Sequence, residues 1–481
     1  MSTTYEKPVI ETNHSNTPTI LFLIVALLLY GWGFFSTILF FIDAKNQPLI
    51  DEISAGITIT LGLSVGLAPF ILLFLILFIP LMIVLSYLLV KMIAKFAQEV
   101  TIIVSVLFPI ILIGVGILIF TLSTESFMIA LIIGGIGAIL LLIVIWKFQS
   151  LKRAGKFVEF SAQLVLDEKA VLWMPILLGL FTMFSGFFLL FGFAEINSLF
   201  MESTPEGDQL SAPGMILAFL FSYFYLIIYF GIYYSLNAGV ISYALDWYRG
   251  LDPDINSAAK DVRQMLPIIL TFAFATATIK MIMQLVMSAG RQSGTRSGRG
   301  GNQTASLVFV AISGFIISII GAIWQFINYF TLVAIIENKQ GLKDSIKDSA
   351  KTRWNSFLDV LVGDTGFGLA MFIFFVINSL IWFVVGFGLG FIIFPNGVAG
   401  LSWTVFAIIF GIVFIFLGSF PYNIVTAPMR IAFTSFLYAY AKDSLEGFQK
   451  PSKLPMELTN EFKQLQKARD KRKMRDPTQY F

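Results

Sequence analysis

Two asparagines inside long apolar segments, Asn237 and Asn328, are the side chains of this sequence best placed to do polar chemistry in a membrane. Each precedes by nine residues an acidic residue, Asp246 or Glu337, that marks the end of its segment. At 1.5 Å per residue the amides lie roughly 13 Å from that end, near the middle of a bilayer. Because hydrocarbon offers an amide no partner, the pair predicts either hydrogen bonds between helices or a polar solute site at the midplane.

Residue types that carry catalysis are scarce. The chain has no cysteine and one histidine, His14, which lies in a polar N-terminal stretch. The carboxylates Glu195, Asp359 and Asp364 lie near the ends of apolar segments, whereas acid–base catalysis needs such groups gathered in a cleft. The sequence also lacks phosphate-loop, zinc-protease and serine-elbow motifs. We therefore expect no enzyme activity, no metal and no cofactor.

The two asparagines belong to two copies of one segment. Residues 250–260 align without a gap on residues 341–351, and each copy lies between two long apolar runs. This pattern predicts a helix–elbow–helix unit repeated in parallel, with a left-handed glycine in each elbow and a lysine reaching headgroups or the preceding acid. The elbow residues are Asp246, Gly250 and Lys260 in the first copy and Glu337, Gly341 and Lys351 in the second.

Composition predicts an all-α, polytopic transmembrane helical bundle. Hydrophobic residues make up 57% of the chain and charged residues 13%, against about 25% charged in soluble domains. A helix needs about 20 apolar residues to cross a bilayer. About ten segments meet that need: 19–42, 67–90, 100–122, 128–146, 171–195, 214–240, 264–286, 305–336, 367–393 and 403–427. We interpret residues 53–90 as containing one span, with a hairpin as the alternative.

The distribution of Lys and Arg predicts the orientation. With the N-terminus inside, most basic residues fall on cytoplasmic segments, as the positive-inside rule requires. We expect a multi-pass protein of the cell (plasma) membrane with both termini in the cytoplasm. Its regions are a polar tail (1–18), an N-terminal membrane region of about five spans (19–213), a C-terminal membrane region with the repeat (214–440) and a basic tail (441–481).

Three segments outside the predicted spans suggest contacts. Residues 148–166 have the spacing of an amphipathic helix on the inner interface, which is either a lipid sensor or docking surface or a connector that packs against the bundle. Asn302 begins an Asn-Gln-Thr triplet that matches a glycosylation acceptor or arises by chance. Six basic residues of the tail are expected to bind anionic lipid headgroups at about 1 kcal/mol each, with a role in setting the topology alone as the alternative: Lys467, Arg469, Lys471, Arg472, Lys473 and Arg475. The expected partners are the bilayer, anionic lipids at its cytoplasmic face and other membrane proteins, with no nucleic acid.

Residues 214–435 resemble an uncharacterised prokaryotic family of polytopic membrane proteins, known as a domain of unknown function. The residues that carry the resemblance are Trp324, Glu337, Gly341, Ile346–Ser349, Trp354 and Gly363–Gly368. The chain departs from the family pattern at 330–332, where a Val-Pro pair is usual, and at Asn355, where glycine is usual. The resemblance implies a helical membrane fold and brings no activity with it.

Three classes of function remain, of which an enzyme acting on lipid has the least support. We expect a non-enzymatic membrane-organising or scaffold protein, because the predicted spans are almost entirely apolar and the inner face is basic. The alternative is a permease or channel for a small or lipidic solute, with a polar site between the two repeats. A polar cavity at the midplane favours the permease, and a solid bundle favours the scaffold.

Overall fold

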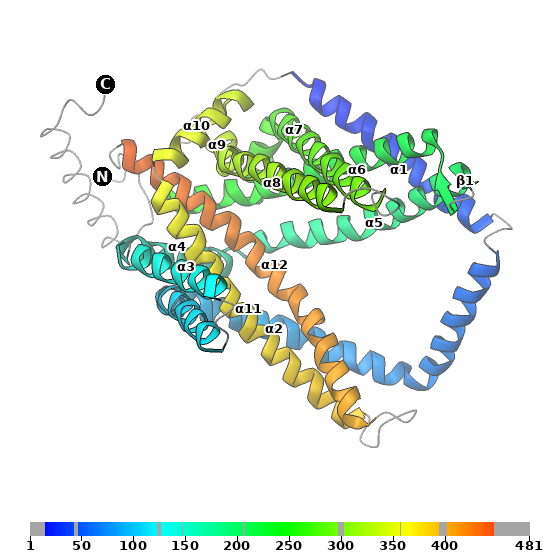
Figure 1. The fold of residues 1–481 in the computed structure, drawn as a ribbon, viewed down its shortest axis with the longest axis horizontal. Coiled ribbons are helices and arrows are strands. Elements are labelled where there is room, and N and C mark those ends of the chain that lie inside the picture. The colour runs from blue at the N-terminus through cyan, green and yellow to red at the C-terminus, as the bar shows by residue number, and fades with distance from the viewer. Residues whose placement is uncertain are drawn as a thin grey trace, which may run out of the picture. The chain divides into compact units, whose positions relative to one another are not determined.

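The computed structural model describes residues 15–42, 47–122, 127–146, 148–204, 207–296, 303–355, 357–393 and 402–446 (Figure 1). These residues form an all-α protein with one short hairpin, as the composition predicts. The helices are α1 (Thr17–Ile42), α2 (Gln47–Leu122), α3 (Phe127–Trp146), α4 (Phe148–Asp167), η3 (Lys169–Leu172), α5 (Trp173–Phe200), α6 (Ala212–Tyr248), α7 (Ile255–Arg296), α8 (Gln303–Asn328), α9 (Thr331–Asn338), α10 (Leu342–Asn355), α11 (Phe357–Ile393) and α12 (Trp403–Glu446). The hairpin pairs β1 (Met201–Thr204) with β2 (Gly207–Leu210) in antiparallel register.

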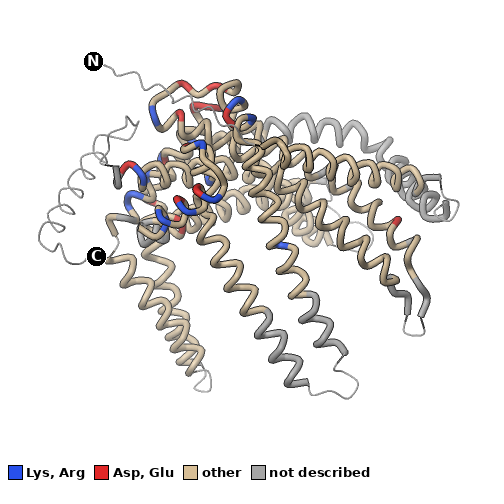
Figure 2. The backbone as a smooth tube through the Cα atoms, turned by 90° about the horizontal axis from the view of Figure 1, so that it is seen from above, with Lys and Arg blue, Asp and Glu red and all other residues tan. Residues whose placement is uncertain are grey.

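Eight segments of the described chain are long and apolar enough to cross a membrane. They are Thr17–Leu39, Val84–Thr121, Phe127–Trp146, Ala212–Tyr248, Ile255–Met287, Gly314–Asn338, Gly363–Ile392 and Trp403–Asp443. Lys169–Thr182 and Phe188–Asn197, around and within α5, are shorter apolar stretches. Charged residues are concentrated in a few segments, and long stretches of the tube are uncharged (Figure 2). The chain thus has the helices of a multi-pass membrane protein, and a total of ten spans stays a prediction.

Helix α2 differs from the expected pair of spans. It runs without interruption through residues 91–99, where the sequence analysis placed a connection, and through 53–90, where a hairpin was the alternative. Residues 91–99 contain neither glycine nor proline and are mostly good helix formers. Their two lysines interrupt the hydropathy of the segment without interrupting its backbone.

The chain divides into two compact units. The first comprises Met1–Phe74, Met174–Ser242 and Asp254–Arg353, and the second comprises Leu75–Trp173, Tyr243–Pro253 and Trp354–Phe481. Each unit is described by itself.

In the first unit, α1, α5 and α6 share a hydrophobic core. Val25 and Leu29 of α1 pack with Ile196 of α5 and with Phe221 and Ile228 of α6. All five side chains are less than a tenth exposed. Helices α6 and α7 are joined along their length by three side-chain hydrogen bonds: Tyr223 Oη to Thr278 Oγ1 (2.7 Å), Tyr234 Oη to Thr276 Oγ1 (3.4 Å) and Ser242 Oγ to Asp261 Oδ2 (2.8 Å).

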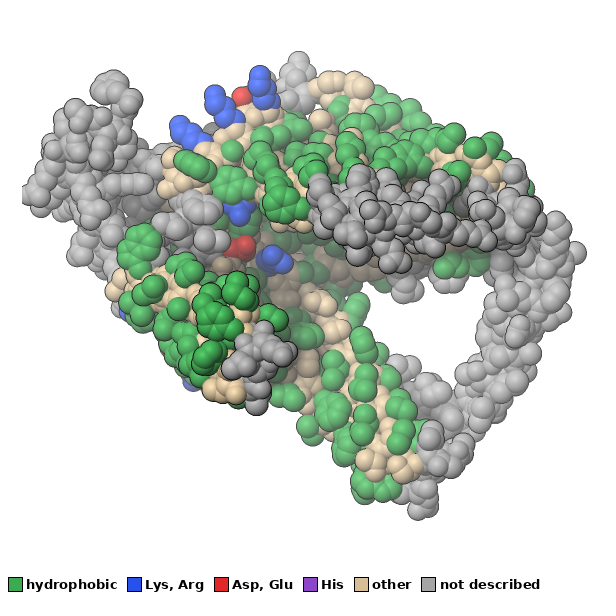
Figure 3. Space-filling model, viewed as in Figure 1, with side chains coloured by type: hydrophobic (Ala, Val, Ile, Leu, Met, Phe, Trp, Pro, Cys, Tyr) green, Lys and Arg blue, Asp and Glu red, His purple; other side chains and the backbone are tan. Residues whose placement is uncertain are grey.

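In the second unit, α11 and α12 pack closely because small residues let their backbones approach. The ring of Trp382 lies on Gly418, where a Cβ atom would collide with it. The Asn378 amide donates to the Gly418 carbonyl (3.1 Å), and the Tyr422 hydroxyl donates to the Met371 carbonyl (2.6 Å). Hydrophobic side chains cover the visible outer face of this helix pair (Figure 3).

Helix α4 forms where the amphipathic helix is predicted, and it packs against α11 and α12. Phe157 and Val158 are at most 2% exposed. Even Glu159 is buried, where it accepts a hydrogen bond from the Gln98 N–H (3.1 Å) and pairs with Lys156 (2.9 Å). This burial favours the connector that packs on the bundle over a helix lying on the membrane surface.

The two elbows differ in the residue that turns left-handed. Gly250 has φ = 78°, and its turn is closed by hydrogen bonds from Gly250 N–H to Trp247 O (3.1 Å) and from Leu251 N–H to Asp246 O (3.0 Å). In the second elbow the left-handed residue is Lys339 (φ = 50°). The expectation for Gly341 is therefore wrong, because α9 ends at Asn338 and the left-handed cap is Lys339, two residues before that glycine.

A pair of glycine substitutions tests this difference. We expect Gly250→Ala to lower the free energy of unfolding by about 1–2 kcal/mol, because alanine is strained at a positive φ. We expect Gly341→Ala to change it by less than about 0.5 kcal/mol, since no atom lies within 4 Å of the added Cβ. Denaturation of the purified protein in detergent measures both, and equal losses would contradict the assignment of the turn.

Candidate functional site

The most unusual backbone feature of the first unit is a break between α8 and α9. The two helices are separated by a turn at Tyr329 and Phe330, inside an apolar segment long enough to span a membrane. Asn328 is the last residue of α8, and its amide nitrogen donates to the Trp324 carbonyl (3.0 Å). Its oxygen accepts a hydrogen bond from the Thr331 hydroxyl (3.0 Å). The predicted midplane asparagine therefore bridges the break within its own segment.

Helix α10 supplies the remaining partners of the break. Ser349 is fully buried, and its hydroxyl donates to the Ile327 carbonyl (2.7 Å) and accepts from the Phe330 N–H (3.0 Å). Arg353 Nη1 donates to the carbonyls of Gln325 (2.8 Å) and Phe326 (3.1 Å). Three carbonyls and one N–H group at the break, of the kind that a broken helix can offer to an ion or solute, are thus engaged by side chains of α10.

The guanidinium of Arg353 also lies over two aromatic rings of the same segment. Its Cζ atom is 4.7 Å from the ring centre of Phe326 and 4.3 Å from that of Tyr329. Such cation–π contacts stabilise a cation that has left bulk water. Together with the carbonyl hydrogen bonds, they fix α10 against the end of α8.

A buried ion pair lies beside the second elbow. Lys339 Nζ is 3.0 Å from Asp261 Oδ1 of α7, with 9% and 6% of the two side chains exposed. The other oxygen of Asp261 accepts from Ser242, and Lys339 also donates to Gln264 (3.4 Å). The first turns of α7 therefore pack against the elbow that follows α9.

The predicted site residues do not converge on one place. Asn237 is half-buried on an uninterrupted α6, and no hydrogen bond joins it to Asn328 in the described chain. Lys260 and Lys351 are exposed, Asp246 is buried at the end of α6, and Glu337 is half-buried on α9. Asn302 and all six basic residues from Lys467 to Arg475 lie outside the described residues.

The sequence analysis missed three groups of contacts. In the first unit it assigned no contact to Asp261 or Arg353, and it included Ser349 only in the stretch that carries the family resemblance. In the second unit it missed Arg249, which is paired with Asp443 in a bidentate geometry with Nη–Oδ distances of 2.6 and 3.0 Å. The hydroxyl of Tyr248 also donates to Asp443 (3.3 Å). The sequence signal for such an ion pair is a charged residue close to an apolar stretch. This signal does not identify the partner, because the partner is far away in the sequence.

In the part of the chain that the structure describes, no three or more His, Asp or Glu side chains come close enough to hold a metal ion. The buried carboxylates Asp261, Asp443 and Glu159 each face a basic side chain. Comparison with known proteins adds no identity: no family model matches the chain, and no curated protein matches it.

Proposed function

We propose that this chain is a non-enzymatic protein of the cell membrane that organises the membrane or holds other membrane proteins. The observation that carries the proposal is the closure of the α8–α9 break by Ser349 and Arg353. A solute path needs polar groups left free for the solute, whereas these groups are bound to α10. A helix break that is closed by neighbouring side chains stabilises the helical bundle. The bundle then contacts lipids and other proteins through its outer surfaces.

The outward face of α10 supports contacts at the membrane surface. Lys343, Lys347 and Lys351 recur every four residues and are exposed, while Ser345 and Ser349 of the same helix are buried. Basic side chains stand along one edge of the surface (Figure 3). A lysine near an anionic bilayer contributes about 1 kcal/mol of binding. We place this edge on the cytoplasmic side, with anionic lipids as its partners.

A permease or channel is the second proposal, and the helix break itself favours it. Discontinuous membrane helices bind substrates and ions in many transporters. In that role Ser349 and Arg353 move away from the break during transport, and Asn328 contacts the solute. The two proposals predict different effects on solute flux when a side chain at the break, Ser349 or Asn328, is removed.

Flux measurements on the reconstituted protein distinguish them. For a scaffold, vesicles containing the protein leak protons, potassium and glycerol no faster than protein-free vesicles. Ser349→Ala lowers the free energy of unfolding by about 1–3 kcal/mol, because the buried Phe330 N–H loses its acceptor, and it opens no path. Cross-linking in intact cells yields a discrete complex that contains this protein.

Ser318→Ala is the matched control. Ser318 is exposed on α8 and its hydroxyl bonds to the carbonyl of its own helix at Gly314, so its loss is expected to cost less than about 0.5 kcal/mol. Rapid flux that Asn328→Leu abolishes without lowering the melting temperature would contradict the scaffold and establish the permease.

A further inference from the structure

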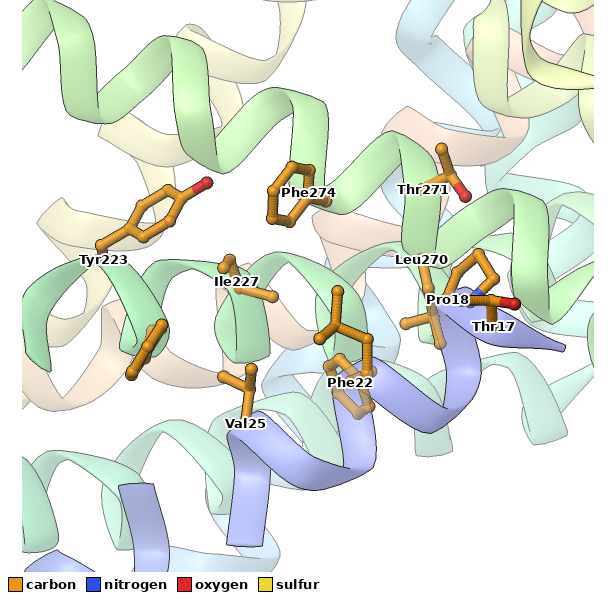
Figure 4. Close-up of a pocket in the computed structure, with 11 residues that line it drawn as sticks. Thr17, Pro18, Phe22, Val25, Tyr223, Ile227, Leu270, Thr271 and Phe274 are labelled. Carbon is orange, nitrogen blue, oxygen red and sulfur yellow. The ribbon is translucent and has the colours of Figure 1, made fainter. Parts of the chain in front are cut away.

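An apolar cavity of about 260 Å³ lies in the first unit between α1, α6 and α7. Phe22 and Val25 reach it from α1, Ile227 from α6, and Leu270 and Phe274 from α7, and these side chains point toward one another (Figure 4). The cavity follows α1 from Thr17 to Val25, a length of about 12 Å. It therefore has the form of a slot that begins at the first turn of an apolar helix.

The polar atoms around this slot are already engaged. The hydroxyl of Tyr223 bonds to Thr278 (2.7 Å), that of Thr271 donates to the Pro267 carbonyl (2.8 Å), and that of Thr17 bonds to Ser15 (2.8 Å). A buried water molecule needs two to four polar partners, and apart from these three hydroxyls the side chains that line the slot are apolar. A ligand in the slot is consequently recognised through hydrocarbon contacts.

The mouth of the slot lies on the hydrophobic outer surface. Leu21 and Phe274 line the slot and are 48% and 42% exposed, whereas Val25, Ile227 and Leu270 are at most 7% exposed and form its floor. The outer face of α1 continues from the mouth with large exposed apolar side chains: Ile20, Ile24, Leu27 and Leu28. In a membrane that surface meets lipid acyl chains.

We propose that the slot holds one acyl chain of a membrane phospholipid. Apolar cavities of about 150 Å³ stay dry and bind small hydrocarbons, and this one is larger and opens toward hydrocarbon. An acyl chain supplies the dispersion contacts that an empty slot lacks. The bound lipid fixes α1 against α6 and α7. This role is additional to the proposed scaffold function and does not depend on it.

Photolabelling of the full chain in phosphatidylcholine nanodiscs tests the site. The probe is a trace of phosphatidylcholine with a photoactivatable group in its acyl chain, and labelled peptides are mapped by mass spectrometry. We expect label to concentrate on residues 17–25, 223–227 and 270–274. Thr271→Trp, which places an indole in the slot, is expected to reduce that label by about tenfold.

Thr182→Trp is the matched control. Thr182 is exposed on α5, and its hydroxyl bonds to the carbonyl four residues earlier, as that of Thr271 does. Melting temperatures report whether each variant is folded. If Thr271→Trp does not fold, Phe274→Ala decides, because a wider mouth is expected to raise the label on Ile227.

Two results overturn the proposal. The first is label on the slot no stronger than on the exposed face of α1, or unchanged in Thr271→Trp and in Phe274→Ala. The second is label from phosphatidylglycerol carrying the same photoactivatable chain but none from phosphatidylcholine, since recognition of hydrocarbon predicts equal labelling by both.

Discussion

Replacing Arg249 with methionine is expected to lower the free energy of unfolding by about 3–5 kcal/mol. Arg249 and Asp443 are 3% and 2% exposed, and their two hydrogen bonds join residues 194 positions apart. Methionine fills much of the arginine volume but leaves the Asp443 carboxylate buried without its cation. Chemical denaturation of the purified protein in detergent measures the loss.

Two further variants make this result specific. In Arg249→Met/Asp443→Leu both charges are gone, so most of the stability is expected to return. In Arg430→Met an exposed cation of α12 is removed, and the expected loss is below about 0.5 kcal/mol. A double variant as unstable as the single one would show that packing of the arginine stem, and not its charge, stabilises this part of the unit.

Local patterns in the sequence predicted most of the helices, but they did not predict which side chains from distant segments contact one another. Apolar length indicated most of the long helices, spacing indicated α4, and the glycine rule placed the left-handed turn at Gly250. The Arg249–Asp443 pair and the contact of Ser349 with the α8–α9 break depend on packing between segments. No local spacing rule identifies such pairs, because each partner alone resembles an ordinary helix residue.

The aligned segments show how small changes alter a shared pattern. Ala258 aligns with Ser349, and both are buried in the helix that follows their elbow. Only Ser349 has a hydroxyl, and it bonds to a broken segment, whereas α6 is continuous in the aligned region. The physical reason is that a helix can break inside an apolar segment only where neighbouring polar groups satisfy its freed backbone. The parallel repeat of a helix–elbow–helix unit stays a prediction.

The sequence also placed the left-handed residue of the second elbow at the wrong position for a physical reason. A lysine at positive φ is uncommon, so the glycine two residues later was the better choice on local grounds. At Lys339 the strained conformation coincides with an ammonium group 3.0 Å from the Asp261 carboxylate. We infer that this ion pair holds the backbone in a conformation that the local sequence disfavours.

Replacing Lys339 with asparagine separates the charge from the backbone conformation. Asparagine tolerates the left-handed region better than most residues, so the turn itself is retained while the ammonium group is lost. Because the buried Asp261 carboxylate loses the ammonium group that faces it at 3.0 Å, we expect the free energy of unfolding to fall by about 3 kcal/mol or more. Denaturation at neutral pH measures it, and Lys347→Asn, at an exposed site on α10, is the control with an expected loss below about 1 kcal/mol.

A second substitution then removes the unpaired charge. Lys339→Asn/Asp261→Asn leaves two neutral amides beside Ser242. Most of the lost stability is expected to return, because position 261 no longer carries a buried carboxylate. If Lys339→Asn alone is as stable as the parent protein, the ion pair does not hold the elbow. The left-handed turn would then follow from packing of the fully buried Ala334 and Ile335.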